Sequence, residues 1–369
     1  MPKPNSISCN LPTAVAVGLL AMLATLLIGH AAEAGSAPPN IVVILADDLG
    51  YGDLGIQGAP DMETPHIDSL FRQGITFEQA YVGHPTCGPS RASLMTGRHK
   101  TRIGFPNNPD NVIPTEPGNL LGLPRGELTL GDLLEKEGYT TGLFGKWHLG
   151  HQKACHPLNR GFDEFYGFLG SLYRYFDLGN LKPPQSILRG FERVYEKEYL
   201  THAFAREGID FMERNKERPF LLFLSHLAVH TPLMYDDASL PVRGLTGTDD
   251  PVENRRMLVN MTENLDRSVG RVINYLYQSG LRKNTLVFFL SDNGGPAVTG
   301  AYSNGPLRDW KGSVFEGGVR VPMAANWPGR IQPGSYRHPV SAMDIVATSV
   351  HLAGGRLPTD RVYDSIDLA

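Results

Sequence analysis

The sequence predicts an α/β fold with a large, mostly parallel central sheet flanked by helices. Two observations predict it. Segments rich in β-branched and aromatic residues alternate along the chain with segments whose apolar residues recur at helical spacing. The strand-like segments are also apolar throughout, which is typical of strands that are buried on both faces of a sheet.

Four segments are expected to form interior strands. The first covers residues 40–45, with the sequence Asn-Ile-Val-Val-Ile-Leu, and the others cover residues 140–144, 220–224 and 285–290. These lengths suit strands better than helices.

Three segments are expected to form helices. Residues 129–136 begin at Thr129, a favourable N-cap residue, and end before Gly138, which suits the turn that closes a helix. Residues 199–214 form the second helix. In the third, over residues 257–276, the apolar residues share one face that should pack on the sheet. These residues are Met257, Met261, Leu265, Val269, Ile273 and Leu276.

Three segments are expected to be surface loops around a site. Residues 107–124 and 232–251 are rich in proline and glycine, and loops of this kind lie at the surface. Residues 107–124 and 173–191 are expected to line the mouth of the pocket. The last residues, 363–369, show no pattern of a packing element.

Length and charge limit the kind of protein. The chain has 369 residues and a formal net charge of −4, which argues against nucleic acid as its main partner. The length alone suggests two domains. However, the site residues described below extend from Asp47 to Lys311 and must converge, so we expect one large domain over residues 38–369.

Residues 1–34 are expected to be a signal peptide. Lys3 precedes an apolar run over residues 13–28, and Ala32-Glu33-Ala34 fits a cleavage site before Gly35. The run is long for a signal peptide, so an uncleaved membrane anchor is the alternative. We therefore expect an exported protein, periplasmic or secreted.

Cleavage would leave two cysteines, Cys87 and Cys155. Cys87 lies where a loop is expected to lead into a helix, and a helix N-terminus stabilises negative charge. That position favours a nucleophile or a modified residue. A buried packing thiol is one alternative, and a disulfide between the two cysteines is another.

Polar residues follow two of the expected strands directly. Asp47 and Asp48 come after the first strand, and Asp292 and Asn293 come after the last. Because ligands gather at the carboxyl ends of parallel strands, these side chains should converge. All-oxygen donors suit a hard cation such as Ca²⁺ or Mg²⁺. The alternative is that each pair only caps a following turn.

Basic residues follow the two middle strands. Lys146 and His148 flank Trp147, so in an extended backbone both would face one side. His230 follows the strand over residues 220–224, and a histidine suits proton transfer near neutral pH. Its neighbour His226 is expected to be structural.

Two stretches resemble the signatures of one family. The run Cys87-Gly88-Pro89-Ser90-Arg91, followed by Thr96-Gly97, resembles the first signature of type I sulfatases, members of the alkaline phosphatase superfamily. Residues 138–148 resemble the second signature, with Phe144 in place of a small aliphatic residue; we expect Phe144 to point into the core. The resemblance implies an alkaline phosphatase-like sandwich fold. Such sulfatases continue into a smaller C-terminal subdomain, which we therefore expect to be missing from this chain.

The resemblance also implies a chemistry for the site. Cys87 would be oxidised to formylglycine by a formylglycine-generating enzyme, which excludes a disulfide, so Cys155 is expected to be unpaired. One Ca²⁺ would be held by the residues that match the family's ligands. They are Asp47, Asp48, Asp292 and Asn293, with position 87 completing the set. The choice of Ca²⁺ over Mg²⁺ rests on the resemblance alone.

The same resemblance assigns roles to the remaining residues. Arg91, Lys146 and Lys311 would surround the ester anion, while Arg320 is expected to be structural. His230 would protonate the departing alcohol. His148 would help to release sulfate from a covalent sulfo-enzyme intermediate. The implied activity is hydrolysis of aryl or carbohydrate sulfate esters.

Two alternatives remain at this stage. One is a phosphonate monoester or phosphodiester hydrolase of the same superfamily. The other is a non-catalytic protein that binds sulfated glycans, although the residues that catalysis would need are present. The oligomeric state is not indicated by the sequence.

Overall fold

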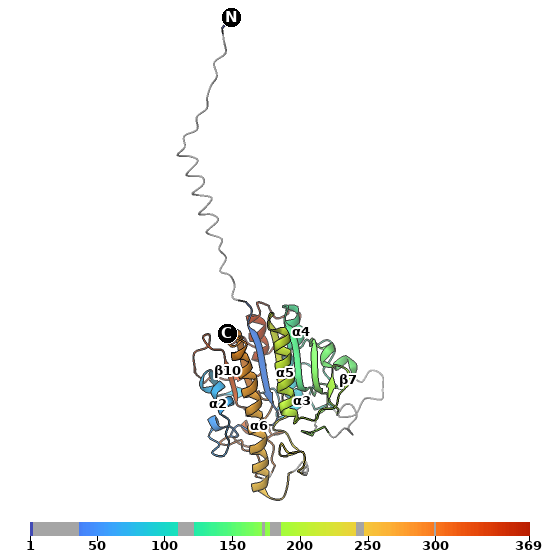
Figure 1. Cartoon of the computed structure of the whole chain (residues 1–369), viewed down its shortest axis with the longest axis vertical. Coiled ribbons are helices and arrows are strands. Elements are labelled where there is room, and N and C mark those ends of the chain that lie inside the picture. Colours follow the sequence, from blue (N-terminus) through green and yellow to red (C-terminus); the bar gives the residue numbers. More distant parts are fainter. Residues whose placement is uncertain (3–36, 110–121, 172–173, 178–185, 241–246, 299) are drawn as a thin grey trace. The chain divides into compact units, whose positions relative to one another are not determined.

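A computed structural model of the chain describes residues 1–2, 37–109, 122–171, 174–177, 186–240, 247–298 and 300–369 (Figure 1). Residues 38–369 form one compact unit. Most of the expected signal peptide lies outside the described residues, and so do parts of the three expected loops, namely residues 110–121, 173, 178–185 and 241–246.

A mixed sheet forms the centre of this unit. Among the described residues it has ten strands in the order β11-β2-β10-β9-β1-β8-β4-β5-β6-β7. The middle five strands, β9, β1, β8, β4 and β5, run parallel to one another. Their bounds are β9 Thr285–Ser291, β1 Asn40–Ala46, β8 Phe220–Ser225, β4 Thr140–Lys146 and β5 Glu164–Phe168. The mostly parallel sheet predicted from the sequence is therefore confirmed.

Shorter strands extend the sheet at both edges. The bounds are β2 Ile75–Phe77, β10 Met323–Asn326 and β11 Gly334–Tyr336 at one edge, and β6 Leu188–Arg189 and β7 Glu192–Arg193 at the other. A separate pair joins β3, Ala80–Tyr81, to β12, Val340–Ser341. β10 runs antiparallel to β9, and β6 runs antiparallel to β5.

Helices cover both faces of the sheet. On one face lie α2 Pro65–Arg72, α5 Leu200–Asn215 and α6 Pro251–Gln278. On the other lie α3 Cys87–Thr96, α4 Leu130–Lys136 and α8 Asp344–Leu352. One short helix, α7 Glu316–Val319, and four 3₁₀ turns complete the described elements. The turns are Gly55–Gln57, Lys153–Cys155, Pro157–Asn159 and Arg282–Asn284.

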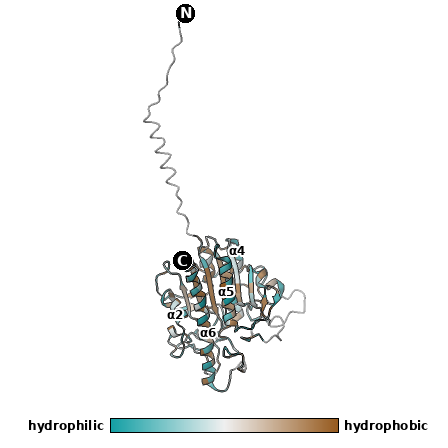
Figure 2. Ribbon diagram, in the orientation of Figure 1, coloured by the Kyte–Doolittle hydropathy of each residue, from teal (hydrophilic) through white to brown (hydrophobic). Residues whose placement is uncertain are grey.

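The predicted helix signals are confirmed. Thr129 caps α4 and forms a capping box with Asp132. Met257 and Met261 of α6 are buried on its sheet-facing side, as expected from their spacing, while the outer side of the helix is polar (Figure 2). Among the described residues, none of the helices is both long and apolar enough to cross a membrane.

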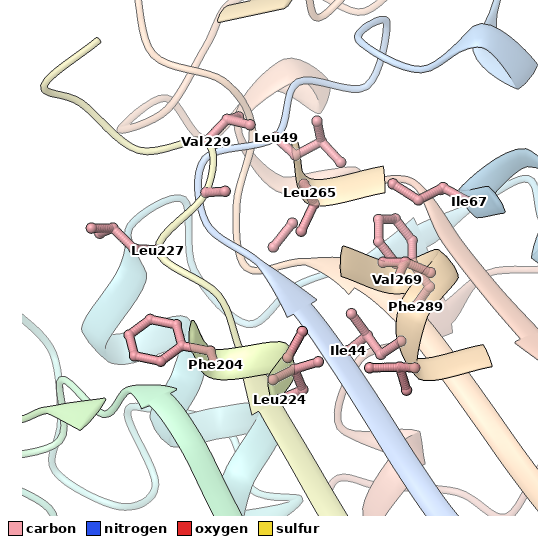
Figure 3. Close-up of a cluster of buried hydrophobic side chains, with 14 of the residues drawn as sticks. Ile44, Leu49, Ile67, Phe204, Leu224, Leu227, Val229, Leu265, Val269 and Phe289 are labelled. Atoms are coloured by element: carbon pink, nitrogen blue, oxygen red, sulfur yellow. The ribbon is translucent and has the colours of Figure 1, made fainter. Parts of the chain in front are cut away.

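The sheet has an apolar core on each face, and alternate residues of β1 pack into one core or the other. Val42 and Ile44 pack with α5 and α6, whereas Ile41 and Val43 pack with α3, α4 and α8. Figure 3 shows the first core, where Ile44 lies among side chains from neighbouring strands and helices such as Phe204 and Phe289. Burial on both faces explains why this strand is apolar throughout.

The C-terminal residues pack on the domain, contrary to the sequence analysis. The backbone N–H of Ile366 donates to Asp344 of α8 at 2.9 Å. Asp364 accepts from Arg102 at 2.9 Å. Tyr363 and Leu368 also pack on the apolar core, but the segment is irregular, so no hydrophobic periodicity indicates its packing.

Candidate active site

Four parallel strands end at the same edge of the sheet and deliver the predicted residues there. In the pairing of β1 with β9, Ala46 lies opposite Ser291, so Asp47 and Asp292 follow side by side. In the pairing of β4 with β8, Gly145 lies opposite Ser225. Lys146 and the segment leading to His230 therefore leave the sheet at this edge too. The predicted convergence is confirmed.

The polar residues after β1 and β9 form one buried cluster. The backbone N–H of Asp48 donates to Asp292 Oδ1 at 3.2 Å, and Asn293 Nδ2 donates to Asp48 Oδ1 at 2.8 Å. Asn293 Oδ1 is buried and has no hydrogen-bond partner among the described residues. Asp48 adopts the left-handed backbone conformation, with φ 63°, which is uncommon for a residue with a side chain. The two pairs do not merely cap local turns.

Cys87 begins α3 beside this cluster. Its Sγ lies 3.5 Å from Asp47 Oδ1 and 3.9 Å from Asp48 Oδ1. Burial raises the pKa of the thiol to about 12 and outweighs the nearby ammonium groups of Lys146 and Lys311. In the unmodified residue, burial beside carboxylates therefore outweighs the helix N-terminus, because it disfavours a further negative charge.

Arg91 lies one helical turn after Cys87, so α3 presents both to the site. Its Nε donates to Asp292 Oδ2 at 2.8 Å, and its Nη2 lies 3.6 Å from Asp47 Oδ1. The guanidinium is buried, and Nη2 has no hydrogen-bond partner among the described residues. One nitrogen of this cation thus lies beside Asp47 with its donors unused among the described residues.

Two lysines reach the same carboxylates from different elements. Lys146 Nζ, at the end of β4, lies 2.6 Å from Asp47 Oδ2 and is buried. Lys311 Nζ lies 2.6 Å from Asp48 Oδ1 and is partly exposed. Burial alone would lower the pKa of Lys311, but Asp48, Cys87 and Asp47 raise it above its ordinary value. Lys311 is therefore a permanent cation on the side of the site open to solvent.

The backbone before Lys146 depends on a glycine. Gly145 has φ 120°, and a Cβ at this position would lie 1.8 Å from the carbonyl oxygen of Ser225. Only glycine allows β4 and β8 to approach so closely here.

The two predicted histidines lie at the site, but one arrives differently from expectation. His148 has φ 59°, so the backbone after Lys146 is not extended and the alternation argument is wrong. Its ring is buried, and neither nitrogen has a hydrogen-bond partner among the described residues. Burial, followed by the charges of Lys146 and Arg91, lowers its pKa well below the ordinary value. His148 is therefore neutral near pH 7.

His230 faces the carboxylates from the segment after β8. Its Nε2 lies 3.5 Å from Asp48 Oδ2, and its Nδ1 lies 2.6 Å from the carbonyl oxygen of Thr231. The carbonyl can only accept, which places a proton on Nδ1 and directs Nε2 into the site. Burial lowers the pKa of His230, although Asp48 opposes the shift.

The carboxylates perturb one another strongly. Burial and the charge of Asp47 raise the pKa of Asp292 to about 7. Burial would also raise the pKa of Asp47, but Lys146, His230 and other cations hold it below its ordinary range. A site that gathers this much buried negative charge favours a bound cation.

The donor set fits a hard cation. Ligand atoms of Asp47, Asp48, Cys87 and His230 all lie within 4.8 Å of one another. The unpartnered Asn293 Oδ1 adds a further oxygen beside them. Carboxylate and amide oxygens are the donors that Ca²⁺ prefers, and an oxygen at position 87 would fit this set better than a thiol.

Four residues with a predicted role lie outside the cluster. Cys155 is buried and free, as expected, so the alternative of a disulfide with Cys87 is wrong. Phe144 is buried against Phe211, at 5.5 Å between ring centroids. Arg320 donates to the carbonyl oxygen of Glu78 at 2.9 Å. His226 is buried away from the hydrogen bonds of the site.

Two serines that hold the site residues in place were not predicted from the sequence. Ser225 Oγ accepts from Arg91 Nη1 at 2.7 Å and donates to the carbonyl oxygen of Lys146 at 2.6 Å. Ser90 Oγ donates to the carbonyl oxygen of Asp292 at 2.6 Å. Ser90 lies inside the Cys87–Arg91 motif, which was a usable signal, whereas Ser225 is simply a small residue at the end of a buried strand.

The sequence matches one known family and known proteins that are named as its members. The family model described as Sulfatase matches residues 39–355. N-acetylgalactosamine-6-sulfatase of Canis lupus familiaris is 37% identical over 377 residues, covering 97% of this chain and 70% of the relative. Steryl-sulfatase of Mus musculus is 34% identical over 455 residues, covering 100% of this chain and 70% of the relative.

A solved structure is similar as well. The crystal structure of Ps i-CgsB in complex with k-i-k-neocarrahexaose superposes with a TM-score of 0.79 at 38% identity. The match covers 90% of this chain and 75% of that one.

Proposed function

This chain belongs to the sulfatase family and is a sulfuric ester hydrolase, and on that premise we propose that it cleaves its ester through a formylglycine formed from Cys87. The observation that carries the proposal is the arrangement of charges around position 87. Arg91, Lys146 and Lys311 each contact a carboxylate of the buried cluster that Cys87 adjoins. Three fixed cations beside one nucleophile suit a sulfate group, whose oxygens bear the charge of the transition state.

Ca²⁺ is the metal that we propose for this site. Asp47, Asp48, Asp292 and Asn293 would hold it together with an oxygen at position 87. When bound, Ca²⁺ supplies positive charge next to position 87 and to the oxygens of the ester. The orphaned Asn293 Oδ1 and the raised pKa of Asp292 support this assignment.

Formylglycine would solve a problem that the unmodified residue has. The thiol of Cys87 is held protonated by burial, so it is a poor nucleophile at neutral pH. The hydrate of an aldehyde carries two hydroxyl groups. One would attack sulfur, so that an O–S bond forms as the bond from sulfur to the alcohol oxygen breaks, and a covalent sulfo-enzyme intermediate would result. The other would later lose its proton, so that the C–O bond to sulfate breaks, sulfate leaves and the aldehyde returns. A formylglycine-generating enzyme would be the partner during maturation.

The two histidines divide the proton transfers. His230 Nε2 points into the site on the side where Lys311 is exposed, and in the doubly protonated ring, which the charge of Asp48 favours, it would give a proton to the departing alcohol. His148 is neutral near pH 7 and has unpartnered nitrogens, so it would accept the proton of the second hydroxyl group.

Carbohydrate sulfates are the substrate class that we favour, with aryl sulfates as convenient probes. One similar structure is a complex with k-i-k-neocarrahexaose, and one similar protein is an N-acetylgalactosamine-6-sulfatase. We also propose that the protein is exported, with residues 1–34 as the signal peptide, on the grounds of the apolar run and the cleavage motif.

Mass spectrometry of the peptide that contains position 87 tests the formylglycine proposal. Protein isolated from its natural host should carry an aldehyde at this position, which a hydrazine reagent labels. Cys87→Ala should abolish sulfate release while the fold is retained. Finding only unmodified thiol in active protein would overturn the proposed nucleophile.

The two alternatives are tested with substrates. The catalytic efficiency should be higher on an aryl sulfate than on the matching aryl phosphonate ester. Higher efficiency on the phosphonate would favour the phosphonate hydrolase. Binding of sulfated sugars without any release of sulfate, by protein that carries the aldehyde, would favour the non-catalytic alternative.

A further inference from the structure

Two tyrosine hydroxyl groups form hydrogen bonds with the backbone of the segment that carries His230. The hydroxyl of Tyr175 lies 2.8 Å from the carbonyl oxygen of His230 and 3.0 Å from that of Leu227. The hydroxyl of Tyr302 donates to the carbonyl oxygen of Val229 at 2.6 Å. Three carbonyl groups within four residues therefore accept hydrogen bonds from tyrosines that belong to two distant parts of the chain.

The other side of this segment is bonded to a proposed metal ligand. The backbone N–H of Asp47 donates to the carbonyl oxygen of Ala228 at 2.9 Å, and that of Val229 donates to the carbonyl oxygen of Asp47 at 2.7 Å. The N–H of His230 closes a turn on Leu227 at 2.8 Å. The segment is thus held between Asp47 on one side and the tyrosines on the other.

Each tyrosine is itself fixed. The ring of Tyr175 stacks on that of Tyr199, with the centroids 5.1 Å apart, and its carbonyl oxygen accepts from the N–H of Leu200 at the start of α5. The residues on either side of Tyr302 are anchored as well. Ala301 accepts from Arg255 at 2.8 Å, and the N–H of Ser303 donates to Asp53 at 2.9 Å.

These two hydroxyl groups act as hydrogen-bond donors and do not titrate near neutral pH. Burial raises the pKa of Tyr175 and of Tyr302 well above the ordinary value, with the carboxylates Asp47 and Asp48 adding to the shift. Both remain protonated donors, as carbonyl acceptors require. Within the described part of the chain, both hydroxyl groups bond to backbone carbonyl groups and not to a side chain of the site, so they act on the site through the backbone that they hold.

The imidazole of His230 depends on this backbone in two ways. The position of its Cα is set by residues 227–230, and its ring orientation is set by the bond from Nδ1 to the carbonyl oxygen of Thr231. We propose that Tyr175 and Tyr302 are positioning residues that fix the distance of His230 Nε2 from the departing oxygen of the ester. The inference rests on the proposed role of His230 as proton donor.

Removal of single hydroxyl groups tests it. Tyr175→Phe, Tyr302→Phe and the double variant keep the rings and delete only the donors. Each is assayed on two sulfate esters, one with a nitrophenol leaving group and one with a simple alcohol. A good leaving group departs without a proton, whereas the alcohol needs one, so proton donation limits only the second ester.

The expected result is a loss that depends on the leaving group. The kcat for the alcohol ester should fall on the order of tenfold in each single variant and further in the double variant, because small misplacements of a catalytic group are costly. The kcat for the nitrophenyl ester and both KM values should change less than about twofold. A merely structural role would lower both kcat values alike.

Tyr139→Phe is the matched control. Tyr139 is also buried, and its hydroxyl donates to the carbonyl oxygen of Pro39 at 2.7 Å, but this bond lies before β1 and β4, at the opposite ends of the strands. It should cost stability without changing the dependence on the leaving group. Equal losses on both esters in the Tyr175 and Tyr302 variants would overturn the inference.

His230→Ala distinguishes the positioning role of the tyrosines from the proton-donor role of His230. If this variant loses activity selectively on the alcohol ester and the tyrosine variants do not, the positioning role is wrong and the proton donor stands. If His230→Ala itself shows no dependence on the leaving group, the proposed role of His230 is wrong.

Discussion

The Nη1 atom of Arg91 donates to Ser225 Oγ at 2.7 Å, while Ser225 Oγ donates in turn to the carbonyl oxygen of Lys146 at 2.6 Å. One buried hydroxyl group thus connects α3, β8 and β4 at the edge where the site lies. With Nε bound to Asp292, this contact leaves Nη2 as the nitrogen of Arg91 without a hydrogen-bond partner among the described residues.

Ser225→Ala should therefore misalign Arg91 without removing its charge. Because Nη1 would keep only the longer bond to the carbonyl oxygen of Lys146, at 3.1 Å, the guanidinium gains freedom to rotate. We expect kcat to fall on the order of tenfold and KM to change little, since a 1 Å misplacement is costly in the transition state. Steady-state kinetics on an aryl sulfate measure this.

Ser268→Ala serves as the control for this prediction. Ser268 of α6 is also fully buried, and its Oγ donates to the carbonyl oxygen of Thr201 in α5 at 3.0 Å, between two helices that cover one face of the sheet. Both variants should lose about 1 kcal/mol of unfolding free energy, and only Ser225→Ala should lose activity. Unchanged kcat in Ser225→Ala would contradict the role of the hydroxyl group.

The parts of the fold that were predictable are those with strong local patterns. The strands β1, β8 and β9 were expected to within one residue at each end, because they are continuous apolar runs. The helix α8 was not expected. Residues Asp344 to Val350 are all buried, so most of the segment lacks the exposed polar face by which an amphipathic helix is recognised.

The site divides in the same way. The residues at strand ends were predictable, because parallel strands must end together. The left-handed backbone of His148 was not, since it follows from how the chain turns after β4. Ser225, Tyr175 and Tyr302 were not predictable either. Which carbonyl group a hydroxyl meets is decided by the approach of segments that are 50 or more residues apart.

Asn293→Asp should reveal the cation site through stability. Asn293 Nδ2 donates to Asp48, so an aspartate would replace a donor by a like charge. In the presence of a chelator, we expect the unfolding free energy to fall by about 2 kcal/mol through repulsion between buried carboxylates. Adding Ca²⁺ should recover most of the loss and raise the Tm more than in the unaltered protein. Thermal denaturation with and without Ca²⁺ checks this.

The matched control for the cation site is Asn264→Asp. Asn264 is fully buried on α6, away from the cluster. This variant should be destabilised in chelator too, but Ca²⁺ should not restore it. Equal recovery in both variants would mean that Ca²⁺ binds elsewhere.

His148→Ala should separate the two chemical steps. If His148 accepts the proton that releases sulfate, its loss slows only the second step. Rapid-quench experiments should show a burst of alcohol followed by turnover slowed by about 10²-fold or more, with sulfated protein detected by mass spectrometry. Because its pKa is lowered well below the ordinary value, the loss should not vary with pH near neutrality. The absence of a burst would place His148 outside the second step.

The thiol of Cys155 should be unreactive until the protein unfolds. The side chain is fully buried and its pKa is raised by burial, so an alkylating reagent meets neither an accessible sulfur nor a thiolate. We expect no alkylation of Cys155 in native protein and complete alkylation in denaturant, with the same Tm in the presence and absence of a reductant. Peptide mass spectrometry measures the modification. A bridged Cys87–Cys155 peptide would contradict this structure.

Acidification should destabilise the protein partly through His226. The ring is fully buried and its nitrogens have no hydrogen-bond partner among the described residues. Burial, assisted by the nearby His202, lowers its pKa from 6.5 to about 3. Below pH 6.5 the unfolded chain therefore binds a proton on His226. The folded chain binds this proton only near the lowered pKa of about 3. Stability from this residue is present at neutral pH and is lost as the pH falls.

The size of this effect makes it measurable. One proton taken up only by the unfolded chain lowers the unfolding free energy by up to about 1.4 kcal/mol per pH unit. His226→Phe and His226→Gln cannot titrate, so both should lose less stability than the unaltered protein between about pH 6 and pH 4, by roughly that slope. Urea denaturation across this interval gives the slopes. The comparison uses slopes because each substitution also changes packing at a fixed pH. A slope in both variants equal to that of the unaltered protein would show that His226 is already protonated in the folded state.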